Sequence, residues 1–286
     1  MNTPETIGRA FSITYREPVI MGIINCTPDS FFDGGSLFTE TGALSEKLLL
    51  TRAENMINAG VRILDLGGES SRPGSAGISA EEEIRRVIPA VCLLKKKFPQ
   101  IIISIDTCKA AVAETAAAEG ADIINDISAF QADPRMAEVM LRERLPVIIM
   151  HMQGTPRHMQ DAPVYSSVAD EVYNFLTERA EFLLNAGFTG KQIIIDPGIG
   201  FGKTLEHNLA LLKAIPRFLE PGFPVLIGVS MKKMVGDLTG RQVNRRLSGT
   251  LGVQLAAVLN GAHIIRVHEP EPFNDLLKCF FAARSA

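Results

Sequence analysis

Eight short apolar runs along the chain each end in polar or ionisable residues. In order, these are Asn25, Asp65, Asp106, Asn125 with Asp126, His151, Asp196, Ser230 with Lys232, and Arg266 with His268. Burying a polar group costs a few kcal/mol unless it is paired, and any one of these residues could make a structural hydrogen bond. His151 is better interpreted as a packing or loop-ordering residue than as a catalytic one. The same feature at the end of all eight runs indicates a functional site.

Two carboxylates and one amide in this set could bind a flat ring with several N–H donors. Asp106 and Asp196 can each accept two parallel N–H bonds from a guanidine-like edge, such as that of an aminopyrimidinone, and Asn125 can add an amide contact. The same carboxylates could instead bind a metal ion or act as general acid and base. Residue type alone does not separate these possibilities.

The cationic residues indicate a binding site for an anion. Arg266 and His268 are two residues apart on one run, so their side chains face the same side of a strand. Lys232 adds positive charge, and Asn25 offers a neutral oxygen to a hard cation. Together they could hold a pyrophosphate with magnesium.

Two loops rich in Gly, Pro and Ser follow the first two runs. The loop NCTPDSFFDGG (25–35) contains Phe31 and could cover a ligand, although an ordinary turn with buried aromatic rings has the same composition. The loop GGESSRPGS (67–75) presents Ser71 and Arg72. An Arg in such a loop suits a phosphate or a carboxylate, whereas the commonest location of Arg in proteins is the solvated surface.

The elements that position these residues are expected to be parallel strands. The eight runs are almost continuously apolar, which is typical of strands buried on both faces, and helix-compatible stretches separate them. We therefore expect a (β/α)8 TIM barrel, one α/β domain over residues 1–286, with its site at the carboxyl ends of the strands. Residues 11–17 could form a hairpin that caps the barrel. The expected strands are 19–25, 62–68, 101–107, 121–127, 146–152, 192–198, 224–230 and 262–268.

Composition excludes several classes of protein. A net charge of -3 makes a nucleic-acid partner improbable. Pro197 stands where a nucleoside-triphosphate-binding loop needs Gly. There is no apolar stretch of the roughly 20 residues that a membrane-spanning helix requires, and no leader pattern is visible. The scattered cysteines, Cys26, Cys92, Cys108 and Cys279, lack metal-ligand spacing and are interpreted as reduced packing residues. Without a leader pattern or a spanning segment, we expect a cytoplasmic protein.

The motifs, taken together, resemble those of the dihydropteroate synthase family from residue 12 to 270. They are NCTPDSFFDGG, LDLGGESSRPGS, SIDTCK, INDIS, MHMQGTP, DPGIGFGK, GVSMKK and IIRVHE, in this order. The resemblance implies a transferase of folate biosynthesis and a target of sulfonamides. It would join 6-hydroxymethyl-7,8-dihydropterin pyrophosphate to p-aminobenzoate with the help of Mg2+.

The resemblance also implies a role for each matching residue. Asp106, Asn125, Asp196 and Lys232 would bind the pterin. Asn25 would bind the metal, and the pyrophosphate would contact Asn25, Arg72, Arg266 and His268. Lys232, Arg266 and His268 would be the catalytic residues. The p-aminobenzoate site would comprise Pro28, Phe31, Ser71, Arg72, Phe201 and Ser230. The family further implies a homodimer.

Two positions depart from the family pattern. Met231 stands where the family usually has Arg, a role left vacant unless Lys233 takes it, and Ser71 replaces Thr. Both substitutions bear on the affinity for substrate analogues more than on the reaction. The alternatives are a pterin-dependent methyltransferase barrel, in which the anion-directed residues would lack a purpose, and a non-catalytic pterin-binding protein, in which loss of Asn25 or Lys232 would be expected.

Overall fold

The computed structural model describes residues 17–27, 37–39, 44–71, 74–75 and 77–285. Eight parallel strands form one sheet in the order β6-β5-β4-β3-β2-β1-β8-β7. The strands are β1 Val19–Asn25, β2 Ile63–Gly67, β3 Ile102–Asp106, β4 Ile123–Asp126, β5 Val147–Met150, β6 Ile193–Asp196, β7 Leu226–Ile227 and β8 Ile264–Val267.

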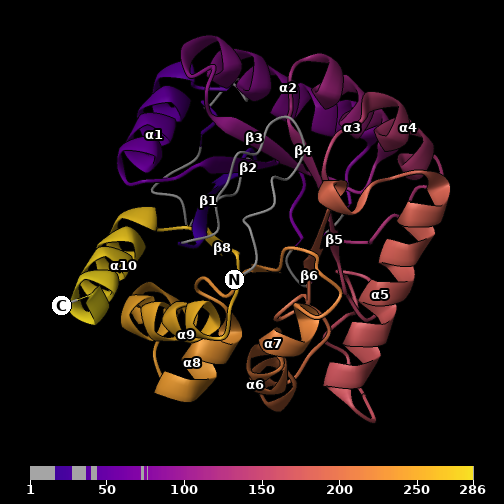
Figure 1. The fold of residues 1–286 in the computed structure, drawn as a ribbon. Coiled ribbons are helices and arrows are strands. Elements are labelled where there is room, and N and C mark those ends of the chain that lie inside the picture. The colour runs from indigo at the N-terminus through magenta and orange to yellow at the C-terminus, as the bar shows by residue number, and fades with distance from the viewer. Residues whose placement is uncertain (1–16, 28–36, 40–43, 72–73, 76, 286) are drawn as a thin grey trace.

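The two ends of the sheet meet, so the sheet closes into a barrel. Ile195 of β6 forms a parallel bridge with Val225, just before β7. The Ile195 N–H also donates to the Pro224 carbonyl at 2.9 Å. Helices surround this barrel (Figure 1). The expected (β/α)8 TIM barrel is confirmed.

Every expected strand is present, but most are shorter than the apolar runs. The greatest difference is at β7, where only Leu226 and Ile227 belong to the strand. Pro224 lacks a donor and Gly228 lacks a side chain to pack, and both residue types weaken strands. The possible hairpin at 11–17 lies almost entirely outside the described residues.

The helices follow the strands, and several carry the expected end signals. Ser79 caps the helix that follows β2, because its hydroxyl accepts from the Glu82 N–H at 3.2 Å, and Lys95 to Lys97 lie in the last turn. None of the described helices is both long and apolar enough to cross a membrane. The helices are α1 Glu46–Asn58, α2 Ala80–Lys97, α3 Ala110–Ala118, α4 Met136–Glu143, α5 Val168–Ala186, α6 Leu205–Lys213, α7 Ile215–Phe218, α8 Lys233–Thr239, α9 Leu247–Leu259 and α10 Pro270–Ser285.

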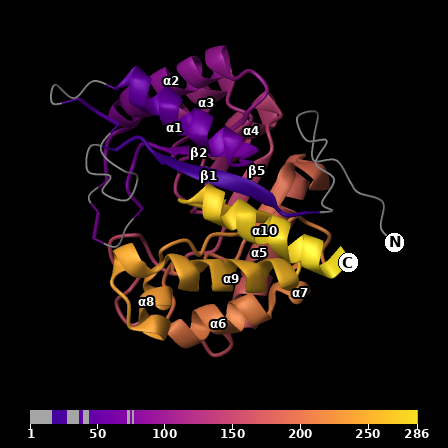
Figure 2. The same cartoon turned by 90° about the vertical axis from the view of Figure 1, so that its left-hand side faces the viewer.

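Side-chain alternation along the strands divides the core into two parts. Outward-facing side chains pack under the helices, whose arrangement along the barrel is seen in Figure 2. Inward-facing side chains at the amino ends of the strands form a separate apolar layer inside the barrel. This layer consists of Val19, Met21, Ile63, Ile123, Ile148, Ile194, Leu226 and Ile264, with Ile102 packed against it. Each such buried side chain contributes about 1.5–3 kcal/mol.

Candidate active site

A polar layer lies on top of the apolar one, inside the barrel. Successive inward positions on a strand are two residues apart, so the inward residue that follows Ile63 is Asp65. In the same way Asn125 follows Ile123, Asp196 follows Ile194 and Arg266 follows Ile264. The strand period therefore carries four of the polar strand-end residues into one barrel mouth.

Arg266 ties two carboxylates together in this layer. Its Nε donates to Asp65 Oδ2 at 2.6 Å, and its Nη2 donates to Asp106 Oδ2 at 2.9 Å. Burial raises the pKa of Asp106 to about 7, although the charge of Arg266 acts in the opposite direction. Burial works against the charge of Arg266 as well, but Asp65 and Asp106 together raise its pKa. Asp106 is thus a carboxyl group that can exchange a proton near neutral pH.

Asp65 orients two other residues of the site, a role that the sequence does not indicate. It is fully buried, and its Oδ2 also accepts from the Asn125 amide at 3.4 Å. Asp65 Oδ1 and the hydroxyl of its register partner Ser104 are buried without a hydrogen-bond partner among the described residues. Asp65 therefore holds Arg266 and Asn125 in place while keeping one unused acceptor oxygen.

Asp196 and Lys232 form a second pair on the far side of the mouth. Asp196 Oδ1 accepts from the Gly198 N–H at 2.7 Å, and burial raises its pKa. Lys232 donates to the Ile199 carbonyl and places its Nζ 4.4 Å from the centre of the Phe201 ring. Burial lowers the pKa of Lys232 to about 8, although Asp196 opposes the shift. The loop after β6 thus brings a carboxylate, an ammonium and an aromatic ring together.

Strand register aligns the other predicted residues along the mouth. Asn25 pairs with Gly67, Gly67 with Asp106, and Asp106 with Asn125. Beyond β7 and β8, the Ser230 hydroxyl accepts from the His268 backbone N–H at 3.2 Å.

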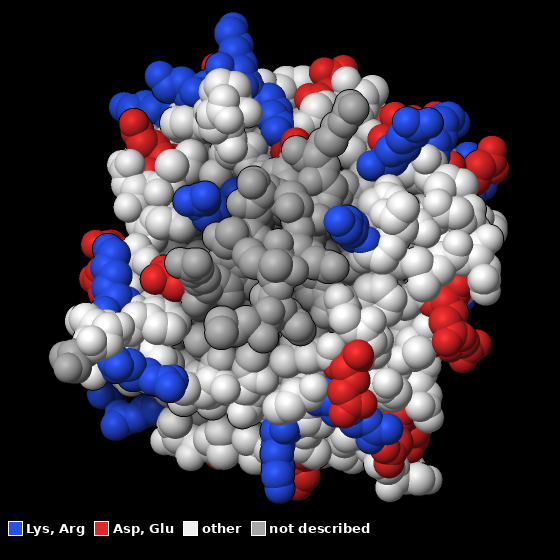
Figure 3. All heavy atoms as spheres, viewed as in Figure 1, with Lys and Arg blue, Asp and Glu red and all other residues white. Residues whose placement is uncertain are grey.

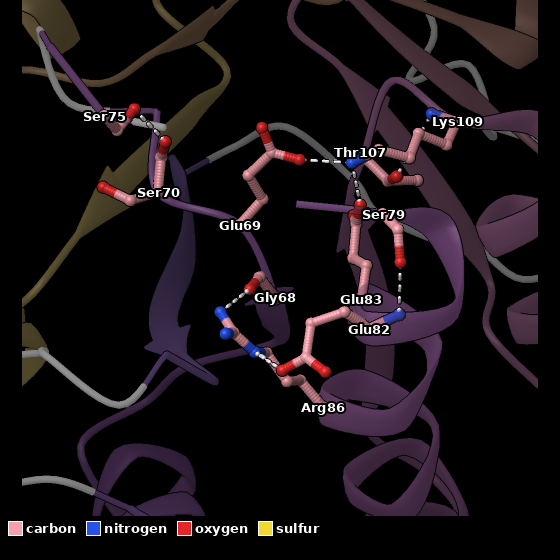
Figure 4. Close-up of polar contacts among 10 residues, drawn as sticks. All are labelled: Gly68, Glu69, Ser70, Ser75, Ser79, Glu82, Glu83, Arg86, Thr107 and Lys109. Carbon is pink, nitrogen blue, oxygen red and sulfur yellow. Dashed lines mark hydrogen bonds and ion pairs between the residues drawn. The ribbon is translucent and has the colours of Figure 1, made fainter. Parts of the chain in front are cut away.

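A salt-bridge cluster fixes the loop after β2, shown in Figure 4. Lys109 bridges Glu69 and Glu83, and Arg86 donates to the Gly68 carbonyl at 3.0 Å. Beside this cluster is a cavity of about 640 Å3. It brings Ser71 and Asp106 together with lining residues that include Lys109, Ile127, Met152 and Phe175.

Two strand-end residues turn away from ligand binding and stabilise loops. Asp126 accepts from the Ser128 N–H at 2.7 Å and from the Phe130 N–H at 3.1 Å. His151 lies 2.9 Å from the buried ammonium of Lys203, and burial lowers its pKa to about 3. Sequence reasoning singled out neither Lys203 nor the Asp65 contacts; the only signal for Lys203 is its place in the Gly-rich segment that contains Asp196.

Three predicted residues, Pro28, Phe31 and Arg72, lie outside the described residues. At the position that departs from the family pattern, Met231 adopts a left-handed φ of 57°, and Thr250 accepts from its N–H at 3.3 Å. Lys233 is exposed and pairs with Asp237 at 2.7 Å. Arg246 instead donates to the Met231 carbonyl at 3.2 Å, so a guanidinium group does lie beside this turn.

Comparisons with known proteins agree with this geometry. The model of the pterin binding enzyme family matches residues 21–268. The dihydropteroate synthase of Escherichia coli K12 is 42% identical over 275 residues, which cover 96% of this chain and 95% of that protein.

Solved structures are similar as well. A Yersinia pestis dihydropteroate synthase in complex with a sulfonamide drug has a TM-score of 0.88 and 38% identity, covering 97% of this chain and 98% of that one. A Xanthomonas albilineans dihydropteroate synthase in complex with 7,8-dihydropteroate has a TM-score of 0.83 and 36% identity, covering 96% of each chain. The chain therefore belongs to the dihydropteroate synthase family of pterin-binding enzymes.

Proposed function

We propose that this enzyme condenses 6-hydroxymethyl-7,8-dihydropterin pyrophosphate with p-aminobenzoate, giving 7,8-dihydropteroate and pyrophosphate. The observation that carries the proposal is the polar layer in the barrel mouth. Its acceptors Asp106, Asn125 and Asp196 surround a space into which Lys232 and Arg266 bring positive charge. Acceptors for ring N–H groups beside cations for a leaving anion suit a pterin that carries a pyrophosphate.

In this mechanism the pterin binds to the carboxylates and the amide, and Lys232 adds a donor. The C–O bond between the pterin methylene and the pyrophosphate then breaks, and Arg266, His268 and Arg72 stabilise the departing anion. The neutral aniline nitrogen attacks the methylene carbon and releases one proton to water. No strong general base is needed, because a neutral aniline is already nucleophilic.

Magnesium fits this site as an ion that arrives with the substrate. Among the described residues, no three His, Cys, Asp or Glu side chains gather in a way that could hold a metal, and Arg266 already engages Asp65 and Asp106. Mg2+ commonly keeps water and substrate phosphate oxygens as ligands, so Asn25 could serve as a single protein ligand. When bound, the ion would neutralise charge on the leaving pyrophosphate.

We place p-aminobenzoate nearer the rim than the pterin. Phe201 and Ser71 supply walls on opposite sides of the mouth, and Ser230 offers a hydroxyl. Pro28, Phe31 and Arg72 would complete the pocket.

The test is synthesis of 7,8-dihydropteroate from the two purified substrates, with and without Mg2+. Product formation that depends on Mg2+ and is inhibited by a sulfonamide is expected. A methyltransferase of the same fold would give no product here and would transfer a methyl group from a folate donor. The double variant Asp106→Asn, Asp196→Asn is the control, because it keeps the fold's side-chain volumes while removing both carboxylates.

We also propose a homodimer and a cytoplasmic location. Leu209 on α6, Leu238 on α8 and Leu259 on α9 are exposed by 40%, 49% and 55%, and these helices lie next to one another (Figure 2). Exposed apolar side chains on adjacent helices suit a second copy of the chain. On the face shown in Figure 3, Lys and Arg are interspersed with Asp and Glu. The four free cysteines suit a reducing compartment.

A further inference from the structure

Lys203 is a buried lysine that the proposed reaction does not use. Only 3% of its surface is exposed. Its Nζ lies 2.9 Å from His151 Nδ1, 3.3 Å from the His151 carbonyl oxygen and 2.9 Å from the Phe201 carbonyl oxygen. An ammonium group has three N–H donors, so each donor has one acceptor.

These contacts join two loops of the barrel mouth. The His151 acceptors follow β5, whereas the Phe201 carbonyl belongs to the loop after β6. The same loop is held from its other side by Lys232, which donates to the Ile199 carbonyl and lies over the Phe201 ring. Two lysines therefore fix the backbone on either side of residue 200, and one of them, Lys232, also lies against the Phe201 ring.

The charge of Lys203 is costly where it lies. Burial lowers its pKa to about 7, and the neighbouring charge of Lys232 adds to this effect while Asp196 opposes it. An apolar side chain of the same length would avoid that cost. In return, the hydrogen bonds of the ammonium group fix the distance between the loop after β5 and the loop after β6.

We propose that Lys203 is a positioning residue for the second substrate. It binds no ligand itself, and it holds the Phe201 ring at the wall where the aromatic acceptor lies. The Asp196 side chain has an anchor of its own, since its Oδ1 accepts from the Gly198 N–H at 2.7 Å. The position of the Asp196 side chain therefore depends on Lys203 less than the position of Phe201 does, although burial raises the pKa of Asp196 and the charge of Lys203 helps to lower it. This inference rests on the proposed function.

The test is the variant Lys203→Met, which keeps the length of the side chain and removes all three donors. We expect the KM for p-aminobenzoate to rise about tenfold or more, because small displacements of a positioning group have large kinetic effects. The dissociation constant of the pterin pyrophosphate should change less than about twofold. Leu212→Ala is the matched control, because Leu212 is buried on α6 away from the loop. Leu212→Ala should lower the Tm. It should not change the KM for p-aminobenzoate more than the dissociation constant of the pterin pyrophosphate.

NMR of the wild-type enzyme tests the contact between Lys203 and His151 directly. If Lys203 donates to Nδ1, His151 is neutral with its proton on Nε2, and 15N NMR of the five histidines should show this tautomer at pH 7. In Lys203→Met the pKa of His151 should rise, because the charge of Lys203 helps to lower it.

Equal losses for both substrates, an unchanged KM for p-aminobenzoate, or the opposite tautomer in the wild-type enzyme would each overturn the inference. If Lys203→Met does not fold, Lys203→Gln is measured in the same way. A wild-type enzyme without synthase activity would instead contradict the proposed function.

Discussion

The carboxyl group of Asp106, proposed to bind the pterin, also affects the stability of the empty enzyme. Burial raises its pKa from the ordinary value of 3.8 to about 7. Between these pH values the folded state keeps a proton that the unfolded chain releases. The free energy of unfolding must therefore fall as the pH rises through this window. Burying this carboxyl group thus lowers the stability of the folded state at neutral pH.

The variant Asp106→Asn should remove this dependence. Relative to the variant, the wild-type enzyme should lose up to about 1.4 kcal/mol of stability per pH unit between about pH 4 and pH 7. Above pH 7 the difference should be constant. Urea denaturation of both proteins across this range measures the effect, and parallel stability curves would show that the pKa of Asp106 is not raised. The variant should also lose affinity for the pterin.

Asp196→Asn should weaken pterin binding by about 2 kcal/mol or more, because an amide presents a donor to the ring N–H groups. Calorimetry with the pterin pyrophosphate measures this. Asp122→Asn is the matched control: Asp122 accepts from the Ile103 N–H at 2.8 Å but precedes β4, at the opposite end of the strand from the mouth. If Asp196→Asn kept its affinity for the pterin pyrophosphate, the role of Asp196 would be only to anchor the loop.

The sequence predicts which residues face the mouth better than it predicts which of them pair. The period of two along each strand is enough to place Asp106, Asn125, Asp196 and Arg266 on the inner face. The pairing of Arg266 with Asp65 joins residues 201 positions apart, and it depends on how the sheet closes. Lys203 was missed for a related reason, since its three acceptors include two backbone carbonyls that have no sequence signature.

At the scale of elements, the loop after β6 requires glycine where it passes the β5 loop. Gly198 has a φ of +69°, and a Cβ there would lie 1.9 Å from the His151 carbonyl oxygen. That oxygen belongs to backbone at the end of a strand, so it cannot move aside without shifting β5. The close approach of the two loops is what allows Lys203 to reach both.

Gly198→Ala should therefore be far more damaging than Gly222→Ala. Gly222 has a φ of +85°, but a Cβ there would meet nothing within 4 Å. Gly222→Ala should cost only the left-handed conformation, about 1–2 kcal/mol, with activity kept. Gly198→Ala adds a backbone clash and should lose most of kcat/KM. Denaturant unfolding and steady-state kinetics of the pair measure both effects, and similar behaviour would contradict the close packing of the two loops.

All eight strands and their order of alternation with helices were predictable, because buried parallel strands have continuous apolar runs. Their ends were less predictable. The run at 224–230 contains a strand of only two residues, since hydrogen bonding across the sheet, not hydrophobicity, defines where a strand stops. The loop at 25–35, expected to cover a ligand, lies mostly outside the described residues.

At the scale of the whole molecule, the exposed leucines of α6, α8 and α9 predict how the chain assembles. We expect the wild-type enzyme to sediment as the proposed dimer and Leu238→Asp to sediment as a monomer, which sedimentation equilibrium would detect. Leu48→Asp is the control, because Leu48 is 51% exposed but lies on α1, away from these helices (Figure 2). An unchanged mass for Leu238→Asp would place the interface elsewhere.

The apolar layer inside the barrel also determines the order in which ligands enter and leave. Its side chains are almost entirely buried, so they close the amino-terminal end of the barrel. Both substrates must therefore enter and leave at the carboxyl ends of the strands. Whatever lies against Asp106, Asn125 and Asp196 must enter first and leave last. A molecule bound at the rim, beside Phe201 and Ser71, would consequently slow the dissociation of the inner ligand without competing for its binding site.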